Sequence, residues 1–115
     1  MKNKFIYIDK LKKEIEFIIG ENAQDNFDVI DQGSPEDYWF HIHNESSCHV
    51  IARVPDGLDR KQKGYIIRKG SEVCKNHSKF RSRIKVEIVY TKVKNIIKSD
   101  IPGMVNISDQ HIIHF

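Results

Sequence analysis

The chain has 115 residues, of which 39% are hydrophobic, and its 19 basic and 16 acidic side chains leave a formal net charge of +3. This length is enough for one domain over residues 1–115 with a real core, and we expect no second domain. No apolar run approaches the roughly 20 residues of a membrane-spanning helix, and the N-terminus lacks a secretion signal. The two cysteines do not form a disulfide framework. We therefore expect a cytoplasmic protein that contacts no membrane.

The N-terminal third predicts a hairpin followed by a short helix. Residues 4–8 and 14–19 are apolar and aromatic runs separated by a charged segment, which is the pattern of two strands joined by a turn. Residues 21–32 have helical spacing, with Phe27 and Ile30 on the apolar stripe. A Gly-Ser-Pro run directly after them ends this helix, because glycine has a permissive backbone and proline favours an extended residue before it.

The stretch from residue 35 to residue 54 holds the only tryptophan and three of the six histidines, and it predicts a central hairpin. With the period of a strand, an apolar core face and a polar face alternate: Tyr38, Phe40 and Ile42 share the first, and Asp37, Trp39, His41 and His43 share the second. A loop centred on Ser46 places Trp39 opposite Arg53 and keeps both apolar sets on one side of the sheet.

The second half begins with the main helix. Asp59 and Gln62 have the spacing of a capping box, and the helix runs from residue 60 to about residue 78. Its apolar stripe consists of Ile66, Gly70, Val73, Cys74 and His77. Gly64 and Gly70 each cost about 1 kcal/mol of helix propensity, so we expect them to mark close packing on the sheet or a break in the helix.

The remaining chain predicts strands. Apolar and polar residues alternate over residues 84–93, as in a strand with one apolar face. Pro102 and Gly103 occupy the central positions that a type II turn prefers, and residues 104–107 and 111–115 follow as a last hairpin. We therefore expect an α+β fold, with a largely antiparallel sheet packed against one long helix plus a short helix or helical turn.

Charge is distributed very unevenly along the chain. Residues 60–98 carry 13 basic and two acidic side chains, whereas residues 1–59 carry six basic and 12 acidic ones. Because the basic segment is also patterned with apolar residues, it indicates a folded basic surface whose natural partner is a polyanion. A solvated lysine-rich face is the alternative interpretation.

Metal binding and catalysis are weaker interpretations. Six side chains are of metal-ligand type, namely His41, His43, Cys48, His49, Cys74 and His77. Their spacing matches no known zinc site, and C-x-x-C pairs are missing. Asp37 and His41 lie about 13 Å apart along a strand, too far for an orienting pair, and there is no nucleophile elbow or phosphate-binding glycine loop. We expect neither an enzyme nor a bound metal or cofactor.

The basic segment and the central hairpin together predict a nucleic-acid-binding surface, because cations neutralise phosphates while aromatic rings and arginine planes stack on unpaired bases. Trp39 beside Arg53 would form a cation–π pair, although a tryptophan packed beneath a helix explains the residue equally well. For the two histidines of the set, support of the hairpin is the favoured alternative to direct contact. The predicted contact residues are Trp39, His41, His49, Arg53, Arg68, Lys69, Lys75, Lys79, Arg81 and Arg83.

Several motifs resemble those of the NFACT RNA-binding domain family. In chain order they are Gly20-x-Asn22-x-x-x-Asn26, Pro35-Glu36-Asp37-x-Trp39-Phe40-His41, Ser46-Ser47-x-His49-Val50, Arg53, Val86-x-Ile88-Val89-Tyr90-Thr91 and Pro102-Gly103-Met104-Val105. The D-x-W-F-H and S-S-x-H-V pair at this separation is the most specific of them. The resemblance covers nearly the whole chain.

This resemblance implies RNA binding without catalysis. It implies transfer or ribosomal RNA as the ligand, the ribosome as a partner, and a role in translation or ribosome-associated quality control. It also indicates a stand-alone member without the other domains of full NFACT proteins. DNA binding by a stand-alone relative is an alternative. So is a protein-interaction module that docks on a translation factor or ribosomal protein.

Overall fold

The computed structural model describes residues 1–115 and contains two α-helices and eight strands. The elements are β1 (Lys2–Ile8), β2 (Lys13–Ile19), α1 (Ala23–Gln32), β3 (Tyr38–Ile42), β4 (Val50–Ala52), α2 (Arg60–Asn76), β5 (Glu87–Lys92), β6 (Ile96–Lys98), β7 (Val105–Ile107) and β8 (His111–His114). Six strands form one antiparallel sheet in the order β1-β2-β4-β3-β5-β8, and β6 pairs with β7 separately. The predicted α+β fold is confirmed.

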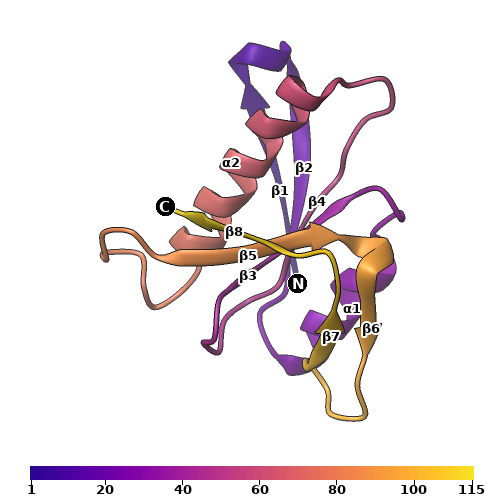
Figure 1. Cartoon of the computed structure of the whole chain (residues 1–115), viewed down its shortest axis with the longest axis vertical. Helices are drawn as coiled ribbons and strands as arrows, with labels where there is room; N and C mark the ends of the chain where they lie inside the picture. Colours follow the sequence, from indigo (N-terminus) through magenta and orange to yellow (C-terminus); the bar gives the residue numbers. More distant parts are fainter.

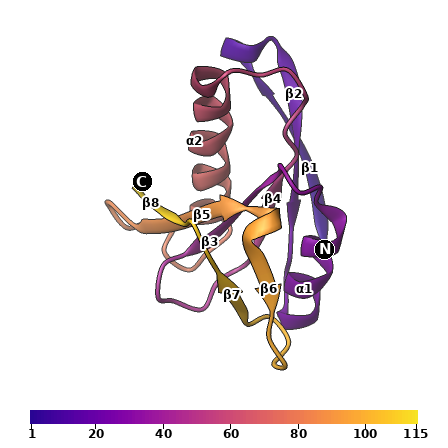
Figure 2. The same ribbon diagram turned by 45° about the vertical axis from the view of Figure 1, so that its right-hand side comes forward.

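Different elements cover the two faces of the large sheet. α2 packs on one face, where Phe17, Phe40 and Ile66 are fully buried. α1 and the β6–β7 hairpin lie on the other face, where Val29 and Trp39 belong to a second, smaller core. Figures 1 and 2 show α2 on one side of the strands and α1 with β6 and β7 on the other. The face that was predicted to be polar therefore carries a core of its own.

The N-terminal elements follow the local sequence signals. β1 and β2 form the predicted hairpin, with Ile6 opposite Ile15. α1 begins at Ala23, two residues later than predicted, because the Asn22 side chain caps the helix by accepting the Asp25 N–H at 2.9 Å. An asparagine cap needs an extended backbone, which places Asn22 just outside the helix.

The central hairpin keeps its predicted faces but not its predicted register. Trp39 lies opposite Ile51 rather than Arg53, a shift of two residues that leaves each side chain on its own face. The connecting loop is longer than a tight turn. Its last residue before β4 is held by the segment after β2, where the His49 carbonyl accepts the Gly20 N–H at 2.9 Å. The local alternation specifies on which face of the sheet a side chain lies, whereas this contact with a distant segment sets which residues of β3 and β4 pair.

Asp37 holds the entry to the central hairpin. Its side chain is buried, and its two carboxylate oxygens accept the backbone N–H groups of Ser34 and Val54, each at 2.8 Å. A charged group is tolerated there because these hydrogen bonds replace the water that it loses. The acidic residue of the P-E-D segment is thus a structural clamp.

α2 begins with the predicted capping box between Asp59 and Gln62, and it ends at Asn76. Gly70 marks close packing, as predicted, since a Cβ at this position would overlap the Phe40 ring. Gly64 does not, because nothing lies within 4 Å of a Cβ built there and the helix is unbroken around it.

The C-terminal hairpin was wrongly predicted. Strand β7 pairs with β6, and β8 pairs with β5 at the edge of the large sheet, so the two strands lie in different sheets. The connection between them is fixed by Thr91 of β5, whose hydroxyl donates to the Ser108 carbonyl at 2.8 Å. The predicted type II turn is present, with the Met104 N–H bonded to the Ile101 carbonyl at 3.0 Å and Gly103 at φ +84°.

Candidate nucleic-acid interface

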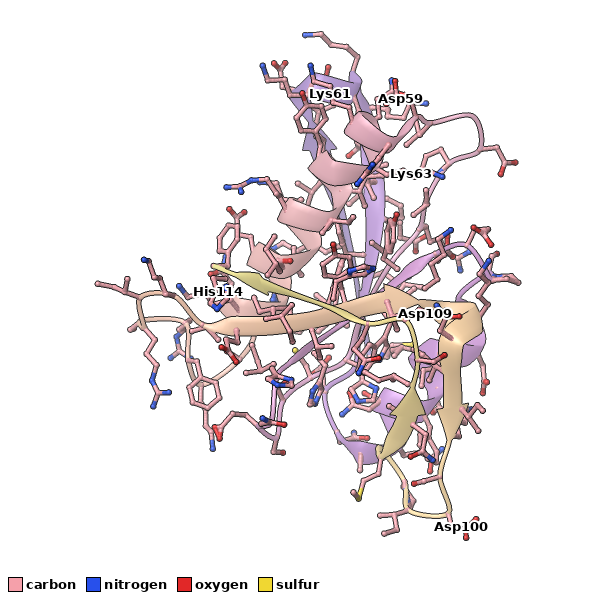
Figure 3. All side chains as sticks on the ribbon, viewed as in Figure 1. Asp59, Lys61, Lys63, Asp100, Asp109 and His114 are labelled. Atoms are coloured by element: carbon pink, nitrogen blue, oxygen red, sulfur yellow. The ribbon has the colours of Figure 1, made fainter.

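A pocket of about 1010 Å³ opens beside the end of the β3–β4 hairpin, on the face that carries α1. Three segments far apart in the sequence form it: the start of α1, the β3–β4 loop and the turn between β6 and β7. Figure 3 marks the end of the β6–β7 hairpin by Asp100, at the opposite end of the molecule from the labelled Lys61 and Lys63 of α2. The volume is in the range that holds small organic ligands.

Three aromatic rings from the central hairpin pack together at this pocket. His41 stacks flat on Trp39, with ring centroids 5.6 Å apart and an interplanar angle of 6°. The His49 ring meets both of them edge-on, with centroids 5.1 Å away in each case. Trp39 is only 2% exposed, so the accessible ring of this stack belongs to the half-buried His41.

His49 is held in place by α1. Its backbone N–H donates to Asn26 Oδ1 at 2.9 Å, and its ring Nδ1–H donates to the Asn26 carbonyl at 2.9 Å. The same Asn26 side chain lies against Gly20, where any Cβ would overlap Oδ1. Each residue of the Gly20-x-Asn22-x-x-x-Asn26 motif therefore has a structural role. Asn22 caps α1, Asn26 binds His49, and Gly20 leaves room for the Asn26 side chain.

Both histidines of the stack are neutral at pH 7. Burial, and to a smaller degree the neighbouring His41, lower the pKa of His49 to about 4, against the opposing effect of the bond to Asn26. Burial also lowers the pKa of His41 below its ordinary value. Because Nδ1 of His49 carries the proton, its Nε2 is a hydrogen-bond acceptor.

Trp39 and Arg53 do not form the predicted cation–π pair. Arg53 instead pairs with Glu16 of β2, with Nε 3.1 Å from the carboxylate. The two-residue register shift explains this, since it moves Arg53 past the end of the β3–β4 pairing. Trp39 Nε1 is left buried with no hydrogen-bond partner.

The turn after α2 carries a group of exposed cations that we call the basic turn, consisting of Lys79, Arg81, Arg83 and Lys85. Lys79 and Arg83 lie over the ring of Phe80, at 5.5 and 4.6 Å from its centroid. None of the four cations forms an ion pair. His77 caps the C-terminal end of α2, directly before this turn, and it also lines the pocket, so the two features are connected through this residue.

The other predicted cations lie on α2 and are already engaged. Lys69 pairs with Glu72 at 3.0 Å, and Lys75 Nζ donates to the Phe115 carbonyl at 2.9 Å. The Arg68 guanidinium lies 5.6 Å from the centroid of the Phe115 ring. The ten predicted contact residues are therefore divided among the pocket, the basic turn, the surface of α2 and, for Arg53, a separate ion pair.

Sequence reasoning missed several residues of the pocket. Asn26 and His77 are the clearest cases, because they were noted only as a motif residue and as part of a helix stripe, respectively. The signal for Asn26 was its spacing from Gly20, but only the folded chain shows that it binds His49.

Neither helix is long and apolar enough to cross a membrane. No three His, Cys, Asp or Glu side chains come together in an arrangement suited to a metal ion. Cys48 and Cys74 are free thiols, and the neighbouring Cys48 together with burial raises the pKa of Cys74.

Comparison with known proteins decides the family. The model of the NFACT protein RNA binding domain matches residues 4–109. The chain belongs to this family. The family is described as one of RNA-binding domains, so the match indicates a nucleic-acid-binding module.

Curated relatives of this NFACT RNA-binding domain include coiled-coil domain-containing protein 25 of Danio rerio, which is 35% identical over 83 residues, 70% of this chain and 40% of the relative. The homologue of Dictyostelium discoideum is 30% identical over 96 residues, 82% of this chain and 47% of the relative. The matches thus span less than half the length of either relative.

Among solved structures, the C-terminal part of the fibronectin/fibrinogen-binding protein of Streptococcus suis has the same fold. The two superpose with a TM-score of 0.80 and 20% identity, over 97% of this chain and 43% of the other. At this identity the likeness concerns the fold alone.

Proposed function

We propose that this domain binds transfer or ribosomal RNA in the cytoplasm, in a ribosome-associated role in translation or quality control. The basic turn would hold the phosphate backbone, and the pocket beside it would face the same RNA. The family match supports RNA as the class of ligand.

The observation that carries the proposal is the contrast between paired and unpaired cations in the basic segment. Lys92 and Lys94 both bind Glu36, at 2.7 and 2.9 Å, and together they hold the pKa of that carboxyl down at about 2. Lys98 pairs with Asp31 at 2.8 Å. The cations of the basic turn, like those at the start of α2, form no ion pair. Those of the basic turn are exposed and follow His77 of the pocket wall, so they are placed to neutralise the phosphates of an RNA that also reaches the pocket.

The test replaces Lys79, Arg81 and Arg83 together with alanine and measures binding of transfer RNA and of ribosomal RNA fragments over a range of salt concentrations. Removing a cation that neutralises one phosphate should reduce the slope of log K against log salt by about 0.7 to 0.9. We expect the triple variant to bind more weakly and with a flatter salt dependence.

A matched control removes the same charge elsewhere on the same segment. The variant in which residues 60, 61 and 63 are alanine loses the same three positive charges, here from one arginine and two lysines at the far end of α2 (Figure 3). It should retain most of the affinity. Equal reductions in both variants would show a diffuse charge effect, and unchanged binding in the first would contradict the assignment of the basic turn. Single-stranded DNA of the same sequence tests the choice of nucleic acid.

A further inference from the structure

The pocket beside the basic turn is not built to hold a phosphate. Its charged lining residues are Lys2, Glu21 and Glu45, which bring more negative than positive charge. The buried histidine pair at its base is neutral at pH 7, because burial lowers the pKa of both rings. A second anion-binding site is therefore a poor description of this pocket, although the basic turn begins two residues after His77 in its wall.

The polar groups in the pocket instead suit a planar, uncharged ligand. Trp39 belongs to the pocket wall, and its Nε1–H is a donor without a partner that other side chains cover in the free domain. His49 Nε2 is an acceptor, because its other ring nitrogen carries the proton that is donated to Asn26. A buried polar group without a partner is rare and calls for an explanation. Nucleobases carry donors and acceptors side by side on their edges.

The walls of the pocket are suited to a flat ring. On one side the half-buried His41 offers the outer ring of the stack, since Trp39 behind it is covered. The turn between β6 and β7 also lines the pocket with apolar groups, including Pro102 and Met104. Met104 is 56% exposed, so its side chain extends from the turn and is not committed to the core.

We propose that this pocket binds one unpaired nucleobase of an RNA whose phosphates lie on the basic turn. The inference rests on the proposed function and adds to it: the domain would recognise a bulged or terminal nucleotide and would bind a continuous duplex less tightly. His77 connects the two subsites, because it lines the pocket and lies at the end of α2, where the chain enters the basic turn.

The test uses three RNA stem-loops that differ at one position: a fully paired stem, the same stem with a single bulged nucleotide, and the same bulge without its base. Trp39 is the only tryptophan, so its emission reports on the pocket directly. We expect the bulged stem to bind about tenfold more tightly than the abasic stem and to change the Trp39 emission, since stacking of one base contributes this order of affinity.

Two variants separate the pocket from the phosphate site. Ser46→Tyr places a bulky ring in the exposed loop that lines the pocket, and His41→Ala removes the accessible ring. Both variants should lose the preference for the bulged stem. Both should bind the paired stem as before, and this retained binding would show that they are folded. His111→Ala, which alters an exposed histidine on β8 that does not line the pocket, is the matched control and should keep the preference.

The outcomes distinguish this inference from the proposed function. Equal affinity for the bulged and abasic stems, with unchanged Trp39 emission, would overturn the nucleobase pocket and leave RNA binding by the basic turn intact. If none of the three stems binds, the proposed function fails and the inference fails with it.

Discussion

Acidification should destabilise this domain specifically through His49. Its side chain is 1% exposed, and burial lowers its pKa from the ordinary value of 6.5 to about 4. The unfolded chain therefore binds a proton more readily than the folded one. The contribution of His49 to the free energy of unfolding is fully present above about pH 6.5, and it is lost as the pH falls from there to about 4.

The size of this effect follows from the pKa difference. One pKa unit corresponds to about 1.4 kcal/mol, so the full loss is roughly 3 kcal/mol, of which about 2 kcal/mol should be lost between pH 7 and pH 5. Urea unfolding followed by Trp39 emission at several pH values measures it. In a His49→Asn variant, the amide can still donate a hydrogen bond to the Asn26 carbonyl but does not titrate.

We expect His49→Asn to be less stable at pH 7 and to lose less stability on acidification than the unmodified chain. The difference between the two pH profiles isolates His49 from carboxylates such as Glu36, whose pKa is lowered to about 2 in the folded chain and which therefore also make stability fall towards acidic pH. The same substitution at the exposed His111 is the control and should leave the profile unchanged. Parallel profiles for the chain and its His49→Asn variant would refute the reasoning.

Further predictions concern packing and the buried carboxylate. Gly70→Ala should destabilise the domain by about 1 to 3 kcal/mol, because the added methyl group overlaps the Phe40 ring. Gly64→Ala on the same helix meets no neighbour and should stabilise it by up to about 1 kcal/mol; thermal unfolding of both variants tests the contrast, and equal effects would contradict it. Asp37→Ala leaves two backbone N–H groups without an acceptor and should cost about 2 to 5 kcal/mol in urea unfolding, whereas a reduction below about 1 kcal/mol would show that the clamp is dispensable.

Local features of the sequence determined much of the fold. The alternation from Tyr38 to Ile42 assigns each side chain to a face, and the Asp59–Gln62 capping box places the start of α2. Pro102 with Gly103 likewise specifies a type II turn. These signals are readable because the interacting groups lie within about four residues of one another, so backbone geometry alone decides the outcome.

The partners of the elements were decided only by the tertiary structure. The central hairpin and the last two strands have alternation that fits more than one pairing, since a shift of two residues keeps every side chain on its face. The choice was made by contacts over long sequence separations, such as His49 with Asn26 and Thr91 with Ser108. Arg53 consequently met Glu16 instead of Trp39.

The candidate site was likewise determined partly by the sequence and partly by the tertiary structure. Composition alone indicated a basic segment and a polyanion as partner, and the motifs indicated the family, because charge and residue order are properties of the chain. Only the fold showed which cations are neutralised by ion pairs and which remain free on the basic turn. It also covered Trp39 and brought His41, Asn26 and His77 to one pocket, since that arrangement depends on how α1 and the β6–β7 hairpin pack on the sheet.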